Sequence, residues 1–154
     1  MICSICPRHC NVDRSVNLGF CQSPDNFRVA RAALHFWEEP CISGKEGSGT
    51  VFFSGCNLKC VFCQNNEISA ENKGVEISDD KLISIFENLI SQGANNINLV
   101  NPTHYAKRLA KVLGIITHTA VSRIVFSFIE YVAGYTVKKR KTGWRQQCGR
   151  RMKG

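Results

Sequence analysis

Residues 78–100 read SDDKLISIFENLISQGANNINLV, and the change from a helical to an extended pattern within this stretch decides the fold. Ser78 suits the N-cap of a helix, Asp79 and Asp80 suit its positive first turn, and Gly93 suits its end. NINLV, residues 96–100, is a short apolar run that predicts a strand. The helix is supported by apolar residues that recur at helical spacing, namely Leu82, Ile83, Phe86, Leu89 and Ile90.

Upstream of the helix, TVFFSG (residues 50–55) is rich in β-branched and aromatic residues and predicts another strand. Strand, loop, helix and strand in this order predict a parallel pair with a right-handed crossover, so the fold class is α/β. Parallel sheets and barrels place their chemistry on loops at the carboxyl ends of strands. Residues 55–67 and the segment NPTHY, residues 101–105, both fall there. We therefore expect a site that joins these two loops and includes His104.

Residues 55–67, GCNLKCVFCQNNE, hold Cys56, Cys60 and Cys63 with gaps of three and then two residues. We call these residues the cysteine loop. A cubane iron–sulfur cluster takes four ligands, so three closely spaced thiolates leave its fourth iron free to bind a small molecule. Two alternatives remain: a structural zinc site completed by a remote cysteine, and a set of free thiols.

The spacing of the three cysteines, with aromatic Phe62 directly before the third, matches the radical S-adenosylmethionine (SAM) signature. The stretches CSICPRHCNVDRSVNLGFC (residues 3–21), HFWEEPCISGKEGSGTVFFSGCNLKCVFCQNNEIS (35–69) and NINLVNPTHY (96–105) resemble an uncharacterised branch of that superfamily. This branch is similar to pyruvate formate-lyase activating enzyme. The resemblance covers about residues 3–105 and ends after Ala106.

The resemblance implies that Cys56, Cys60 and Cys63 bind a [4Fe-4S] cluster whose fourth iron binds SAM. It implies that Phe62 lies beside the adenine and that Asn101, Pro102 and Thr103 stand where relatives bind the methionine amino group. The Gly-Gly-Glu motif that often serves there is absent, and no catalytic residue is assigned. The implied activity is formation of a 5′-deoxyadenosyl radical that abstracts a hydrogen atom, with a glycyl position in a partner enzyme as a target. A one-electron donor such as flavodoxin or ferredoxin is implied as a partner.

A second group of cysteines, Cys3, Cys6, Cys10 and Cys21, lies near the start of the chain with gaps of two, three and ten residues. Four thiols are the right number for a second metal site, either an iron–sulfur cluster or zinc. The alternative is a set of reduced cysteines without a metal.

The net charge of +8 is distributed unevenly. Residues 1–106 carry 8 Lys and Arg against 11 Asp and Glu, whereas residues 107–154 carry 12 against one. The end of the chain, KKRKTGWRQQCGRRMKG (residues 138–154), is a basic tail with one Trp, which is typical of nucleic-acid or membrane-surface binding. It follows an apolar stretch without a clear linker, so we expect neither partner.

We divide the chain into a cysteine-rich extension with a connector, residues 1–49, and an incomplete (β/α) domain with the basic tail, residues 50–154. From Thr50 onward there is room for about three strand–helix units, fewer than a closed barrel needs. We therefore expect the N-terminal portion of a parallel partial barrel, truncated or frameshifted after about residue 106. An inactive fragment and a metal-bound binding module are the alternative functions.

The composition sets two further expectations. No run of 18 apolar residues is present, so the sequence predicts no membrane span. The opening MICSICPRHC has no apolar signal region, and nine cysteines in a reducing compartment favour metal or redox chemistry over disulfides. We therefore expect a cytoplasmic protein.

Overall fold

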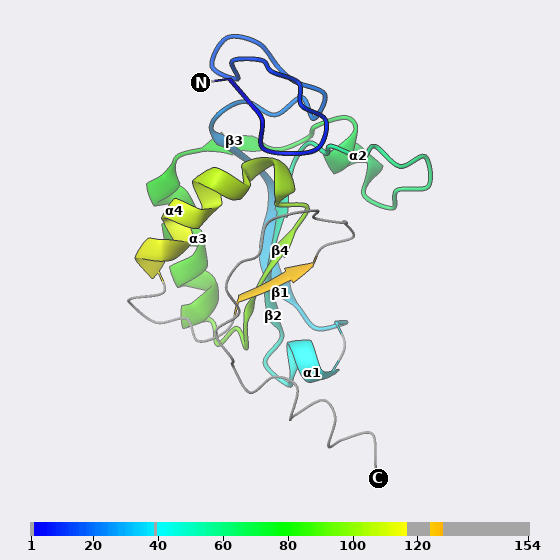
Figure 1. Cartoon of the computed structure of the whole chain (residues 1–154). Coiled ribbons are helices and arrows are strands. Elements are labelled where there is room, and N and C mark those ends of the chain that lie inside the picture. Colours follow the sequence, from blue (N-terminus) through cyan, green and yellow to red (C-terminus); the bar gives the residue numbers. More distant parts are fainter. Residues whose placement is uncertain (1, 39, 117–123, 128–154) are drawn as a thin grey trace.

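The computed structural model describes residues 2–38, 40–116 and 124–127 (Figure 1). The basic tail and Cys148 lie outside these residues. The elements follow the order β1 (Phe27–His35), α1 (Pro40–Ser43), β2 (Ser48–Phe53), α2 (Asn66–Ser69), β3 (Val75–Ile77), α3 (Asp79–Ser91), β4 (Ile97–Val100), the 3-10 turn η1 (Thr103–Tyr105), α4 (Ala106–Ile116) and β5 (Ile124–Ser127).

The strands form one sheet in the order β3-β1-β2-β4-β5. β2 pairs with β4, and β4 with β5, in parallel. The predicted parallel pair with its crossover helix is therefore confirmed, and β5 continues the same pattern. β1 runs antiparallel to both of its neighbours, so the α/β sheet is mixed.

β1 lies within residues 1–49, which the sequence analysis assigned to the extension and its connector, and it belongs to the sheet. Val29 pairs with Phe53 of β2, and Phe27 pairs with Ile77 of β3. The alternation of buried and exposed residues along β1 is hard to predict from the sequence, because the pairing register shifts between Val29 and Arg31. Such an irregularity moves later side chains out of a strict period of two.

Helices α3 and α4 cover one face of the sheet (Figure 1). The predicted capping of α3 is confirmed, since the Ser78 hydroxyl accepts a hydrogen bond from the Lys81 amide at 3.2 Å. Gly93 follows the helix at φ +89°, and its amide donates to the Ile90 carbonyl at 2.9 Å. Within the described residues, every helix is too short or too polar to cross a lipid bilayer.

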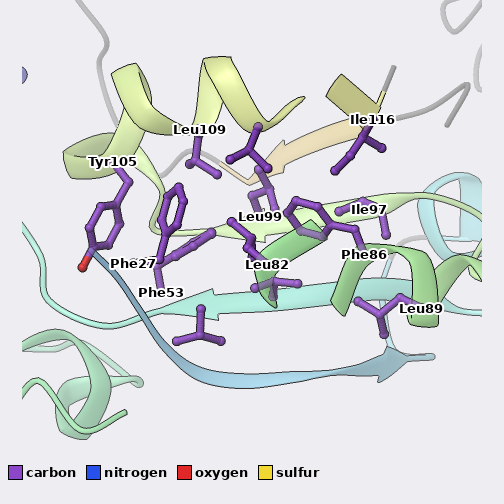
Figure 2. Packing of buried hydrophobic residues seen from close by; sticks show 13 residues of the cluster. Phe27, Phe53, Leu82, Phe86, Leu89, Ile97, Leu99, Tyr105, Leu109 and Ile116 are labelled. Atoms are coloured by element: carbon purple, nitrogen blue, oxygen red, sulfur yellow. The ribbon is translucent and has the colours of Figure 1, made fainter. Parts of the chain in front are cut away.

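The core fills the space between these helices and the sheet (Figure 2). Phe27, Phe53 and Tyr105 form an aromatic cluster with ring centroids 5.2–5.9 Å apart. Burial of each such side chain contributes roughly 2 kcal/mol. The rest of the buried cluster comes from both helices and from the central strands: Val29, Val51, Leu82, Phe86, Leu89, Ile97, Leu99, Leu109, Val112 and Ile116.

Candidate metal and cofactor site

Residues 2–26, which we call the amino-terminal segment, lie at the end of the sheet where β2 and β4 finish (Figure 1). Arg14 fastens the segment there and is only 6% exposed. Its Nε donates to the Ser23 carbonyl at 3.0 Å, Nη2 to the Pro24 carbonyl at 2.5 Å and Nη1 to the His104 carbonyl at 2.6 Å. The guanidinium also lies over the Tyr105 ring, 5.1 Å from its centroid.

The cysteine loop leaves β2 at Gly55, beneath the amino-terminal segment. Gly55 has φ +81°, and a Cβ there would contact the Ser23 hydroxyl and lie 2.5 Å from the Cys21 carbonyl. Glycine is therefore required both by the backbone angle and by the close packing. The segment and the loop touch directly at this point.

The three cysteines of the loop are free thiols that differ in exposure. Cys56 is 9% exposed, and its sulfur accepts a hydrogen bond from the Leu58 amide at 3.3 Å. Cys60 and Cys63 are half-buried, and the Cys63 amide donates to the Cys60 carbonyl at 3.1 Å. The Cys63 sulfur also lies 3.3 Å from the Ser69 hydroxyl. The backbone from Cys60 to Cys63 thus forms a tight turn, closed by the hydrogen bond from amide to carbonyl.

The donor set of this loop fits an iron–sulfur cluster, because soft thiolates are its usual ligands and amide N–H groups aimed at the sulfurs tune it. The sulfurs do not yet converge: across residues 2–38, 40–116 and 124–127, no three His, Cys, Asp or Glu side chains are grouped to hold a metal ion. Cluster ligation by Cys56, Cys60 and Cys63 therefore stays a prediction.

The loop after β4 meets the cysteine loop, as the parallel topology predicts. Asn101 adopts φ +58°, and its Nδ2 donates to the Gly55 carbonyl. Of the residues that the resemblance assigns to the cofactor, Pro102 and Thr103 are buried behind this contact. Phe62 is 84% exposed at the far part of the cysteine loop. The structure thus places Asn101 in contact with the cysteine loop, whereas the Phe62 side chain is largely exposed to solvent.

His104 lies behind the cysteine loop rather than on an open surface. It is 1% exposed, and its Nε2 donates to the Ser54 carbonyl at 2.9 Å. Burial lowers the pKa of His104 to about 3, against a smaller upward effect of the Ser54 carbonyl, and the Arg14 charge lowers it further. The ring is therefore neutral, and its Nδ1 has no hydrogen-bond partner among the described residues.

The amino-terminal cysteines gather around one cavity. Its lining includes Cys3, Cys6, Cys10 and Cys21, together with His104. Burial raises the pKa of the Cys6 thiol, the Arg8 amide lowers it, and the charges of the other three thiols raise it. The four cysteines that the sequence groups as a candidate metal site thus line one cavity, and metal binding by them stays a prediction.

Sequence reasoning missed the polar contacts that hold the two cysteine-bearing segments together. Arg8 Nε donates to the Asn57 carbonyl at 2.8 Å. The Arg8 guanidinium and the Lys59 ammonium both lie over the Phe20 ring, 4.0 and 5.0 Å from its centroid. No local pattern could have shown the contacts between the two segments, since Arg8 and Asn57 are 49 residues apart and Phe20 and Lys59 are about 40 apart.

Comparison with known proteins agrees with this architecture. Residues 50–133 match the family model of the radical SAM superfamily. The match corrects the expected end of the resemblance at Ala106, because it continues through α4 and β5. No solved structure matches the chain.

The chain is also similar to one curated protein over part of its length. Over 67 residues the chain is 42% identical to the uncharacterized protein MJ0674 of Methanocaldococcus jannaschii. The aligned part covers 44% of this chain and 19% of that protein, so the chain spans a small part of the relative it matches. With a family model that covers more than half of its length, the chain belongs to the radical SAM superfamily.

Proposed function

We propose that this chain is the cofactor-binding part of a radical SAM enzyme, with Cys56, Cys60 and Cys63 as ligands to three irons of a [4Fe-4S] cluster. When bound, the reduced cluster supplies one electron that breaks a carbon–sulfur bond of SAM, giving methionine and a 5′-deoxyadenosyl radical that takes a hydrogen atom from the substrate. The observation that carries the proposal is the position of the cysteine loop, at the carboxyl end of β2 in the middle of the sheet.

The residues around the loop support this role in different ways. Burial of Cys56 and the Leu58 amide on its sulfur keep one ligand in place before the cluster binds. Asn101 joins the loop after β4 to the cysteine loop by a hydrogen bond to the Gly55 carbonyl. Cys60 and Cys63 are less buried, and their part of the loop must adjust to bring three sulfurs to one cluster.

Cofactor binding is assigned to residues on both loops. The exposed Phe62 ring is available to cover the adenine, because an aromatic face packs well on a flat base. Asn101, Pro102 and Thr103 line the adjacent strand end and contact the methionine portion. These roles rest on the resemblance together with the contact between the two loops.

The proposal also covers the substrate and the partner proteins. The branch that the sequence resembles is similar to pyruvate formate-lyase activating enzyme, so a glycyl position in a partner protein is the proposed target. Flavodoxin or ferredoxin is the proposed electron donor, in the cytoplasm. Val61 and Phe62, fully and largely exposed, give the cysteine loop an apolar surface suited to a macromolecular partner.

Anaerobic reconstitution with iron and sulfide tests the proposal. The expected result is about four irons for this site, broad absorbance near about 400 nm and 5′-deoxyadenosine after reduction with SAM present. Cys60→Ala should lose this cluster, whereas Cys41→Ala, outside the loop, should keep it. Spectra that show no cubane, or a cubane whose irons are all bound by protein sulfur, would contradict the proposal. Iron without SAM cleavage would support the inactive fragment instead.

A further inference from the structure

The amino-terminal segment has little apolar core of its own. Four of its large apolar side chains are exposed: Ile2 by 64%, Val16 by 79%, Leu18 by 56% and Phe20 by 40%. The described part of the segment contains no helix or strand, and its pairing is an isolated bridge between Ile2 and Asp13. Units of this size usually need a disulfide or a metal to stay folded, and here the cysteines are free thiols.

Backbone hydrogen bonds form tight turns at Cys3 and Cys6 of the segment. The Cys3 amide donates to the Val12 carbonyl at 2.8 Å, and the Asn11 amide donates to the Cys3 carbonyl at 3.1 Å. The His9 amide closes a turn on the Cys6 carbonyl at 3.2 Å, with His9 itself at φ +45°. Tight turns between closely spaced cysteines are what a tetrahedral thiolate site requires.

The backbone of Gly19 and Phe20 packs closely against the Cys10 side chain. Gly19 packs so closely that a Cβ there would lie 3.3 Å from both Cβ and Sγ of Cys10. The Phe20 amide donates to the same sulfur at 3.3 Å. Cys21 follows directly and is buried, so the chain returns the fourth thiol to the cavity that the first three line.

The cavity also has a buried polar group without a partner. His104 lines it, and Nδ1 of that ring has no hydrogen-bond partner in the described part of the chain. The cavity is small, about 10 Å³, and its lining supplies four thiols, the number that closes a tetrahedral zinc site. The ligand set therefore fits a single zinc ion.

We propose that Cys3, Cys6, Cys10 and Cys21 bind one zinc ion, which fastens the amino-terminal segment over the cysteine loop. Zinc takes four thiolates in a closed tetrahedral site. Because no three of these side chains already share an ion position in the described residues, the thiols turn toward the cavity on binding. The site is independent of the radical chemistry and does not require the cluster.

The test uses the full chain with the cysteine loop disabled, as Cys56→Ser/Cys60→Ser/Cys63→Ser. After expression with zinc, this variant should retain about one zinc per chain by elemental analysis and native mass spectrometry. A further Cys10→Ser change should remove it, whereas Cys41→Ser should not. Failure of the zinc site leaves the cluster assignment intact, and failure of the cluster leaves this one intact.

A second readout needs no variant. In the zinc-loaded wild-type chain, iodoacetamide should modify Cys3, Cys6, Cys10 and Cys21 slowly, and a chelator should raise their modification at least about tenfold. Absence of zinc from the loop-disabled chain, iron and sulfide in its place, or equal alkylation with and without chelator would overturn the proposal.

Discussion

Arg14 donates to the backbone carbonyl of His104 at 2.6 Å across 90 residues of sequence, and this contact joins the amino-terminal segment to η1, the turn that follows β4. The same guanidinium satisfies the carbonyls of Ser23 and Pro24. No carboxylate within the described residues is paired with it in the structure, so the carbonyl oxygens and the Tyr105 ring balance its charge. Arg14 thus ties the amino-terminal segment to the loop after β4, in addition to the contact of Arg8 with Asn57.

Replacing Arg14 tests this role directly. Arg14→Met should lower the free energy of unfolding by on the order of 3 kcal/mol, because it leaves buried carbonyls without a donor. Urea unfolding followed by circular dichroism measures the change. Arg8→Met is the matched control, since Arg8 is exposed, donates one backbone hydrogen bond and lies over the Phe20 ring, and it should cost about 1 kcal/mol. Equal losses in the two variants would contradict the assignment.

Gly55 offers a second test of the packing between segment and loop. Gly55→Ala should destabilise the fold by roughly 3 kcal/mol, because the new Cβ adds a clash with the Cys21 carbonyl to the strain of φ +81°. Gly93→Ala is the control: its φ is +89°, but no described atom lies within 4 Å of the added Cβ. It should cost about 1 kcal/mol from the backbone angle alone. If both variants unfold at the same urea concentration, the clash is not significant.

The lowered pKa of the buried His104 should make the stability of the fold depend on pH. Its pKa falls from 6.5 to about 3 on folding, so in this range the unfolded chain binds a proton that the folded chain does not. This contribution to stability is complete above about pH 6.5 and is lost as the pH falls toward the folded value, with a slope of up to about 1.4 kcal/mol per pH unit.

The measurement is urea unfolding between about pH 5 and pH 8, with chelator and reductant present to exclude metal effects. His104→Gln should flatten the pH dependence, because glutamine does not titrate. His9→Gln is the control, since His9 is exposed in the folded protein. An unchanged slope in His104→Gln would show that other groups cause the dependence.

Phe62 and Val61 form a matched pair on the cysteine loop, since both are exposed and neither supports the core. Phe62→Ala and Val61→Ala should each change stability by less than about 0.5 kcal/mol. If Phe62 covers the adenine, its loss should weaken SAM binding to the reconstituted protein about tenfold, whereas Val61→Ala should have little effect. Isothermal titration under anaerobic conditions distinguishes the two.

The unit formed by β2, α3 and β4 could be predicted because its signals lie close together in the sequence. The cap at Ser78, the apolar spacing of α3 and the β-branched run of β2 each depend on residues close in sequence, and the structure confirms all three. The meeting of the two strand-end loops followed from parallel topology alone and is confirmed by Asn101 and Gly55. The metal assignments of the seven cysteines remain predictions.

Long-range contacts could not be predicted from sequence. β1 was missed because its pattern shifts after Val29 and its pairing comes from partners on both sides. His104 was expected to belong to the site because its loop follows a strand, but its burial and its contact with the Ser54 carbonyl could not be read from the sequence. In both cases the deciding partner lies tens of residues away.

The direction of β1 has a consequence for the whole molecule. Because it runs opposite to β2, with Val29 beside Phe53, the residues that precede it emerge where β2 finishes. A strand of the reverse polarity would have delivered them to the α1 end, far from Gly55 and His104. The orientation of β1 thus determines that the amino-terminal segment lies over the cysteine loop.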